Sequence, residues 1–194
     1  MVGKGQATKE RILDNALELA STVGFEGLSL GELAKVSAMS KSGLFAHFES
    51  KEDLQLEVLR AAAASFIDTV VSPALREPRG EPRVRALFER WVRWDAMRKG
   101  GCPFVAASHE FDDRSGRLRD ALVSVQRDWF DILSTAVRIA QEEGHFRTDI
   151  DADQVAFEIY GVAMGFHLFH RLLRDPRAHE RAQEAFERLL RSVS

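Results

Sequence analysis

Apolar residues recur along this 194-residue chain with the period of an α-helix and not with that of a β-strand. No stretch sustains an alternation of apolar and polar residues backed by β-branched side chains, which a half-buried strand would require. An all-α fold is therefore predicted. In the first periodic segment one broad face collects Ile12, Leu13, Ala16, Leu17, Leu19, Ala20 and Val23.

Glycine, proline and capping residues divide this periodic pattern into separate helices. The segment 73–82, with three prolines and a glycine, is the clearest break. Ser29 and Glu32 have the spacing of a capping box, and Ser50 precedes two acids, so both serines are expected to begin helices. The expected helices run from Thr8, as cap, to Gly24, over 30–37, from a cap at Ser40, from Ser50 toward Pro73, and over about 84–98, 103–111, 118–143, 153–174 and 176–191.

Composition places the chain among globular proteins, with 45% hydrophobic and 29% charged residues. The longest apolar runs are far shorter than the ~20 residues that span a bilayer, so no membrane partner is expected. The start, MVGKGQATKER, lacks the apolar stretch of a signal peptide. The single cysteine, Cys102, excludes an internal disulfide, and we expect a cytoplasmic protein.

Two short helices joined by a tight turn are expected between residues 30 and 48, supported by the amphipathic helix before them. This order predicts a helix-turn-helix, in which Leu33, Val36, Leu44 and Phe48 face inward. The outward side then carries small and polar residues that fit a major groove about 12 Å wide and offer donors to bases and phosphates. They are Ser40, Lys41, Ser42, Gly43 and His47. The alternative is a packed helical hairpin with a solvated polar face.

The same stretch resembles a known family. TKERIL at 8–13, GFEGLSL at 24–30, AK at 34–35, SKSGLFAHF at 40–48 and SKEDL at 50–54 are similar to the DNA-binding domain of TetR/AcrR-type transcriptional regulators. The resemblance covers roughly residues 8–60 in unbroken order. It implies a DNA-binding domain at 1–50, joined through a helix at about 51–72 to a helical effector-binding and dimerisation domain at 51–194.

Carried over by position, the resemblance implies a recognition helix from Ser40 to Phe48. Residues nearest the bases or along the phosphates would then be Ser29, Ser40, Lys41, Ser42, Gly43, Leu44, Phe45, His47 and Lys51. Three positions depart from the common pattern. Ala38 stands at a turn position that is often Gly, Phe45 replaces a frequent Tyr, and Gly43 stands where Thr or Ala is frequent.

The resemblance also implies a homodimer formed by the last two helices, at about 153–191. Wide apolar surfaces on both helices agree with a four-helix interface across a twofold axis. Gly161 and Gly165 would permit close helix approach there, or within one subunit. Residues of the apolar surfaces are Val155, Ile159, Val162, Ala163, Phe166, Phe169, Leu172, Leu173, Phe186, Leu189, Leu190 and Val193.

Aromatic residues are dense in the second domain and are candidates to line a pocket for a small, mostly apolar effector. The alternative is that they form the core, where helical domains bury aromatic surface. The candidates are Phe66, Phe88, Trp91, Trp94, Phe104, Phe111, Trp129, Phe130, Phe157 and Tyr160.

Cys102 lies just before an expected helix, a position where a cysteine can act as a redox sensor. We favour the alternative, a buried thiol without such a role. His109-Glu110 with Asp112-Asp113, and His167 with His170, contain metal-ligand residue types, but neither set is complete at a recognised spacing. No metal and no cofactor are expected.

The sequence thus predicts a dimeric, effector-responsive repressor that reads a palindromic double-stranded DNA operator, and not an enzyme. Two rivals stay open at this point. One is an enzyme with Cys102 as nucleophile and His109 as base, and the other is a small-molecule carrier that has lost DNA binding. The net charge of −3 argues for few phosphate contacts and a shallow salt dependence.

Overall fold

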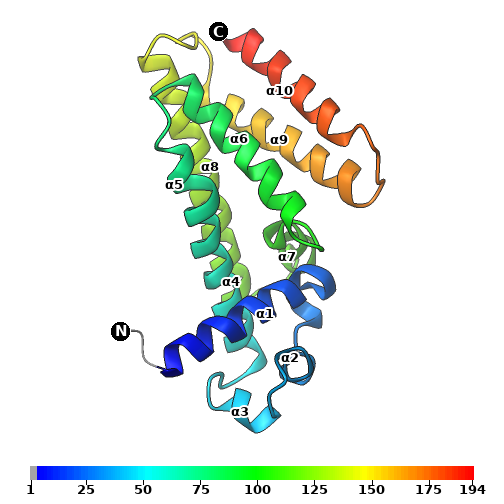
Figure 1. Cartoon of the computed structure of the whole chain (residues 1–194). Coiled ribbons are helices and arrows are strands. Elements are labelled where there is room, and N and C mark those ends of the chain that lie inside the picture. Colours follow the sequence, from blue (N-terminus) through cyan, green and yellow to red (C-terminus); the bar gives the residue numbers. More distant parts are fainter. Residues whose placement is uncertain (1–3) are drawn as a thin grey trace. The chain divides into compact units, whose positions relative to one another are not determined.

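The computed structural model describes the backbone of residues 4–194 and the side chains of residues 8–194, and every element in this part is a helix (Figure 1). The predicted all-α fold is therefore confirmed. The helices are α1 Lys4–Gly27, α2 Leu30–Ser37, α3 Lys41–Phe45, α4 Lys51–Phe66, a π-helical segment Ile67–Val71, α5 Ser72–Ala74, α6 Glu81–Met97, α7 Pro103–Phe111, α8 Arg117–Glu142, α9 Ala152–Arg171 and α10 Ala178–Val193.

Contacts between residues group the chain into two compact units. Unit 1 holds the described residues up to Ser65 together with Arg98–Val125, and unit 2 holds Phe66–Met97 and Gln126–Ser194. Each unit is described by itself below. The predicted functional boundary between residues 50 and 51 stays a prediction. Residues 1–3 of the predicted DNA-binding domain lie outside the described residues.

Helix α1 supplies the central apolar face of unit 1. Ile12, Ala16, Leu17 and Ala20 are buried, as their helical spacing predicts. Two expectations are wrong. Val23 is exposed, and the helix begins at Lys4 and not after Thr8, because Gln6 and Ala7 are residues that helices tolerate well.

The helix predicted to end at Gly24 instead bends there and continues to Gly27. The φ of 77° and ψ of 168° at Gly24 lie outside the helical region, in a part of backbone space that only glycine adopts readily. The last turn of the helix, from Phe25 to Gly27, is thereby redirected. Phe25 and Leu28 are then buried in the core of unit 1.

The long helix predicted to end at Pro73 instead changes register before it. Proline has no backbone N–H and clashes with the carbonyl four residues earlier, so regular α-helical bonding to Thr69 is impossible. The chain absorbs this as the π-helical segment Ile67–Val71 and continues through Pro73 to Ala74. The break therefore begins at Leu75, two residues later than expected.

Unit 2 is a bundle in which α10 packs against α9 and α9 packs against α6 (Figure 1). The rings of Phe88 on α6 and Phe186 on α10 are stacked with centroids 4.0 Å apart. Both side chains are almost completely buried, which gives this contact the large hydrophobic stabilisation typical of aromatic pairs. The predicted helices of this part are confirmed within a few residues at each end.

Candidate nucleic-acid interface

Two serine caps and one left-handed residue form the helix-turn-helix. The Ser29 hydroxyl accepts the Glu32 N–H at 3.2 Å and begins α2, as predicted. Ala38 ends that helix with φ 51° and ψ 39°, which costs a residue with a Cβ about 1–2 kcal/mol. The chain then reverses, and the Ser40 hydroxyl accepts the Gly43 N–H at 3.1 Å to begin α3.

The inner side of the motif is nearly as predicted. Leu33 and Leu44 are completely buried and Phe48 almost so. Val36 was expected there but is 53% exposed, because Leu30, Leu33 and Ala34 form the buried stripe of α2 and Val36 lies beside it. The motif is thus held by packing, and the polar side of α3 is left outside.

Helix α3 presents small and cationic groups to the surrounding solvent. Ser40, Lys41 and Ser42 are exposed, with the two hydroxyl oxygens 3.1 Å apart. Phe45 is 57% exposed, whereas Gly43 and His47 are partly covered. The exposed set contains a cation, hydroxyl groups and an aromatic ring, which are groups that contact phosphates and base edges in a major groove.

Three of the predicted DNA-contacting residues make contacts within the motif and its supporting helices. Leu44 is buried, and its N–H donates to the Ser40 carbonyl, so the expectation of a contact from its side chain is corrected. The Ser29 hydroxyl is used as a cap. Lys51 Nζ donates to the Glu26 carbonyl oxygen at 2.6 Å and lies 3.4 Å from a carboxylate oxygen of the same residue.

The recognition helix is also shorter than the segment Ser40 to Phe48 that the resemblance implied. Regular α-helix ends at Phe45. His47 N–H and Phe48 N–H both donate to the Leu44 carbonyl, at 2.9 and 3.1 Å, so the chain finishes in a tighter turn. This turn brings the Phe48 ring into the core.

Cations in this region differ in how far their charge is already neutralised. Lys35 Nζ lies 2.6 Å from Glu32, and Lys9 Nζ lies 2.9 Å from Glu57. The hydrogen bond from Lys9 holds the pKa of the Glu57 carboxyl below its ordinary value. Lys41, by contrast, makes no ion pair with any acid of residues 8–194, so its charge is available to a phosphate.

The predicted effector residues do not gather in one unit. Phe104 and Phe111 are buried in unit 1, on α7, while the other candidates belong to unit 2. There the Phe66 ring meets Trp94 and Trp129 edge to face, with centroids 5.5 and 5.0 Å away. The remaining candidates are Phe88 and Trp91, both buried, Phe130 and Tyr160, both partly exposed, and Phe157, which is 64% exposed.

A buried acid in unit 2 was missed by the sequence reasoning. Asp95 on α6 is 0% exposed, and its Oδ1 lies 2.6 Å from Nδ1 of His167 on α9. A signal was present in the sequence. Asp95 follows Trp91 by four residues and therefore lies on the same buried face of the helix.

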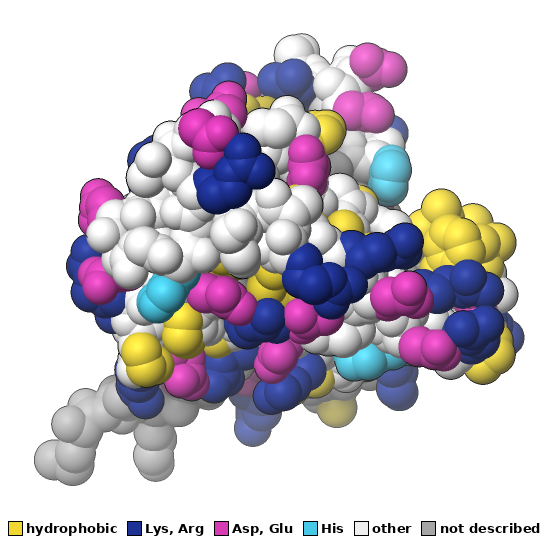
Figure 2. Space-filling view, turned by 90° about the horizontal axis from the view of Figure 1, so that it is seen from above, with side chains coloured by type: hydrophobic (Ala, Val, Ile, Leu, Met, Phe, Trp, Pro, Cys, Tyr) yellow, Lys and Arg dark blue, Asp and Glu magenta, His cyan; other side chains and the backbone are white. Residues whose placement is uncertain are grey.

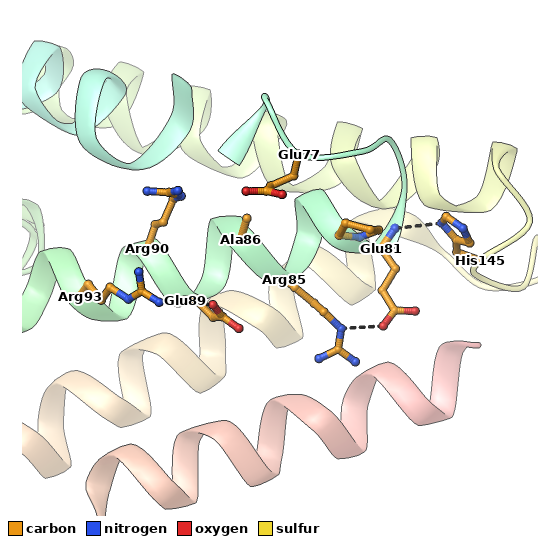
Figure 3. A pocket seen from close by; sticks show the side chains of 9 residues that line it. Glu77, Glu81, Arg85, Ala86, Glu89, Arg90, Arg93 and His145 are labelled. Carbon is orange, nitrogen blue, oxygen red and sulfur yellow. Dashed lines mark hydrogen bonds and ion pairs between the residues drawn. The ribbon is translucent and has the colours of Figure 1, made fainter. Parts of the chain in front are cut away.

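Two of the grooves on the surface of unit 2 differ in character. A groove of about 610 Å³ runs along α6 and is lined by charged side chains, including Glu77, Arg85, Arg90 and Arg93 (Figure 3). At its end His145 Nδ1 accepts the Glu81 N–H at 3.1 Å. A second groove of about 200 Å³ is almost entirely apolar and is formed by Val162, Gly165, Phe166, Phe169, Ala178, Arg181, Ala182 and Ala185.

Cys102 is buried, as favoured, while His109 is exposed. In the described part of the chain, no three His, Cys, Asp or Glu side chains are arranged to hold a metal ion. Among the same residues, no helix combines the length and the apolar character needed to cross a membrane.

Comparison with known families matches both parts of the chain. Residues 12–58 match the bacterial regulatory proteins of the tetR family, and residues 80–186 match the tetracyclin repressor-like C-terminal domain. The second match alone covers more than half of the chain. A helix-turn-helix followed by this helical domain defines a transcriptional regulator and not an enzyme. The chain belongs to the TetR family.

Individual relatives extend this result. The transcriptional repressor NemR of Escherichia coli K12 is 25% identical over 172 residues, which are 87% of this chain and 86% of NemR. AcrR of Shigella flexneri is 40% identical over 55 residues, 28% of this chain and 26% of AcrR. Over this match, the chain spans about a quarter of the length of that relative.

Solved structures share the fold. A TetR regulator from Chloroflexus aurantiacus superposes with a TM-score of 0.85 at 26% identity, over 96% of this chain and 94% of that one. AibR, solved with isovaleryl coenzyme A and operator DNA, has a TM-score of 0.76 at 23% identity, over 94% of this chain and 98% of AibR. At that identity the likeness to AibR shows the fold alone.

Proposed function

We propose that this TetR-family regulator is a homodimeric repressor that binds a palindromic DNA operator through α3 and releases it when a small, mostly apolar effector binds the larger domain. The observation that carries the proposal is the exposed, unneutralised Lys41 beside two hydroxyls at the capped start of α3. Such a protein acts where the chromosome lies, so a cytoplasmic location follows from this function.

We assign the DNA contacts from the exposure of each predicted residue and from the hydrogen bonds that it already makes. Lys41, Ser42 and Gly43 lie at the start of α3, the end of a recognition helix that reaches base edges. Ser40, Phe45 and His47 flank it and would meet the sugar-phosphate backbone. Ser29 and Lys51 are assigned a supporting role, because their polar groups already hold the motif together.

A second copy of the chain is the proposed occupant of the apolar surface on α9 and α10. Phe157, Leu168, Phe169, Leu172 and Leu173 are exposed on α9 and just after it. Hydrophobic side chains gather at the right edge of Figure 2, the side on which the end of α9 lies in Figure 1. Exposed apolar patches of this kind mark association surfaces, and two helices from each copy would form a four-helix interface.

This surface is also shaped for close approach of another helix. A Cβ added to Gly161 or to Gly165 would meet nothing within 4 Å in one chain, so the space beside both glycines is open. The apolar groove lined by Val162 and Phe169 lies on the same helix. An isologous dimer would bury each of these features against its symmetry copy.

The aromatic cluster around Phe66 supports an apolar effector with one polar group. Trp129 is almost completely buried, yet its indole N–H has no hydrogen-bond partner among the described residues. A buried donor left without an acceptor costs about 1–3 kcal/mol. An effector whose carbonyl or hydroxyl oxygen accepted this N–H would recover that energy while its apolar part lay against the rings of Phe66 and Trp94.

The test is to select duplexes from a random library with the purified protein and to measure binding to the selected duplex by fluorescence anisotropy at several salt concentrations. We expect a palindromic site whose half-sites lie about one duplex turn, roughly 34 Å, apart. Lys41→Ala should lower affinity for all sequences and reduce the salt slope by about one per protomer. Lys99→Ala, which also removes an exposed lysine of unit 1, is the matched control.

A protein that showed no preference for any duplex over random DNA would contradict the proposal. A protein that bound a ligand but no DNA would instead support the alternative function, a small-molecule carrier that has lost DNA binding.

A further inference from the structure

The break in α1 at Gly24 redirects the backbone N–H groups of Phe25 and Glu26, and one side chain from α7 accepts both of them. Glu110 Oε1 accepts the Phe25 N–H at 3.2 Å, and Glu110 Oε2 accepts the Glu26 N–H at 2.6 Å. A carboxylate that receives two backbone N–H groups makes charge-assisted hydrogen bonds, which are about twice as strong as neutral ones.

The glycine at this position is required by the same contact. A Cβ built on Gly24 would lie 2.1 Å from Glu110 Oε1, well inside van der Waals distance. In the turn that precedes α7, a Cβ on Gly100 would lie 1.2 Å from the Ser21 carbonyl oxygen. Two glycines thus let α7 and the turn before it lie directly against the backbone of α1.

Carbonyl groups of the same two residues are held from α4. Gln55 Nε2 donates to the Phe25 carbonyl at 2.6 Å in a buried bond, and Lys51 Nζ donates to the Glu26 carbonyl at 2.6 Å. The peptide groups at Phe25 and Glu26 are therefore fixed on both their donor and acceptor sides. Glu110 is the side chain that accepts hydrogen bonds from both N–H groups.

These two residues immediately precede the helix-turn-helix. Leu28, two positions on, is completely buried, and Ser29 caps α2. The direction in which the chain leaves Glu26 therefore sets where α2 begins, and α2 carries the turn and α3. Glu110 itself lies in the segment that matches the regulatory C-terminal domain, residues 80–186.

We infer that Glu110 is a positioning residue for DNA binding, whose carboxylate orients the start of the helix-turn-helix from a helix of the regulatory segment. The inference rests on the proposed DNA-binding function. The hydrogen bonds from the Phe25 and Glu26 N–H groups to Glu110 can be tested separately, because they exist with no DNA present. Loss of the carboxylate would free both N–H groups and let α2 and α3 sample other orientations.

The experiment compares Glu110→Gln, Glu110→Ala and the control Asp113→Asn in the full chain. Asp113 is exposed and, as Asn, loses the same negative charge three residues further along. Amide hydrogen exchange at Phe25 and Glu26 is followed by NMR without DNA, and affinity for the selected duplex is measured by anisotropy. Exchange at α4 amides reports whether unit 1 stays folded.

We expect exchange at Phe25 and Glu26 to rise about tenfold in Glu110→Gln and further in Glu110→Ala, because Gln keeps one acceptor and Ala none. Affinity for DNA should fall in the same order. The sign of this change separates positioning from simple charge. Removing an acid near DNA would by itself raise affinity, and Asp113→Asn measures that effect.

Unchanged exchange at Phe25 and Glu26 in both Glu110 variants would overturn the inference. So would an affinity that rose, or that changed by the same factor as in Asp113→Asn. If Glu110→Ala also exposes the amides of α4, the decision rests on Glu110→Gln, which conserves the size of the side chain. Wild-type protein that binds no DNA contradicts the proposed function, while the exchange result still tests the hold on the backbone.

Discussion

Asp95 and His167 join α6 to α9 through a contact of 2.6 Å between a completely buried carboxylate and an imidazole nitrogen. A carboxylate in the interior of a protein is tolerated only when hydrogen bonds and opposite charge replace the water it has lost. The 72 residues that separate the two side chains in sequence are thereby tied together within unit 2.

Substitution of His167 by Leu should therefore destabilise the protein by about 3 kcal/mol, because the buried carboxylate loses this partner. The double variant Asp95→Leu with His167→Leu should be less destabilised than His167→Leu alone, since the charge is removed with its partner. Urea unfolding followed by circular dichroism measures both. Equal stabilities of the single variant and the wild type would show that this pair contributes nothing.

Local signals explain which parts of the fold could be predicted from the sequence. The bounds of α2 and α7 agree with the expected ranges because a capping serine and an early proline act within a few residues of themselves. The Ser40 cap and the left-handed turn at Ala38 are also local signals, since each acts on residues close to it in the sequence. The helix-turn-helix was therefore predictable in position and in most of its buried residues.

Contacts between distant residues explain what could not be predicted. Glu110 lies 85 residues from Phe25, and no local pattern links them. The contact of Lys51 with the Glu26 carbonyl, 25 residues earlier, is of the same kind, while its contact with a phosphate stays a prediction. The exposure of Val36 likewise depends on how α2 is turned against α1, which the spacing of apolar residues fixes only roughly.

Ala38→Gly should stabilise the protein. Ala38 has φ 51° and ψ 39°, and removal of its Cβ relieves a cost of about 1–2 kcal/mol, part of which is offset by the greater freedom of glycine in the unfolded chain. We expect a net gain of up to about 1 kcal/mol in the free energy of unfolding. Ala46→Gly is the matched control, because Ala46 has φ −71° and should lose stability instead. A loss in both variants would contradict the assigned strain.

The stability contributed by Arg85 and Glu187 should depend on pH. Arg85 donates to both carboxylate oxygens of Glu187, and this hydrogen bonding is the main reason that the pKa of Glu187 is lowered from its ordinary value of 4.5. A lowered folded-state pKa stabilises the protein above the ordinary pKa, and the contribution is lost as the pH falls below 4.5 through the folded value.

Arg85→Gln should consequently cost up to about 1 kcal/mol at pH 7, because both side chains are about one third exposed and solvent weakens the pair. Near pH 3 the variant and the wild type should approach equal stability. Urea unfolding at pH 7, 5 and 3 makes the comparison, with Arg188→Gln, an exposed arginine on the same helix as Glu187, as control. A cost that persisted undiminished at pH 3 would assign the effect to packing of the Arg85 stem.

Leu172→Glu should dissociate the proposed dimer. Leu172 is 74% exposed in one chain, directly after α9, and lies within the apolar surface assigned to a second copy. A glutamate there would have to bury an unpaired charge, which costs several kcal/mol and should raise the dimer dissociation constant more than a hundredfold. Leu75→Glu removes a leucine that is 46% exposed elsewhere in unit 2 and controls for the general effect of an added charge.

Sedimentation velocity over a range of concentrations distinguishes the outcomes. The wild type and Leu75→Glu should sediment as dimers at micromolar concentration, and Leu172→Glu as a monomer. Because the proposed dimer would read two half-sites through two linked recognition helices, the monomer should also lose most of its affinity for the selected palindrome while it keeps its weak binding to random duplex. A Leu172→Glu protein that remained dimeric would place the interface on another surface, and one that was monomeric yet bound the palindrome fully would remove dimerisation from the basis of specificity.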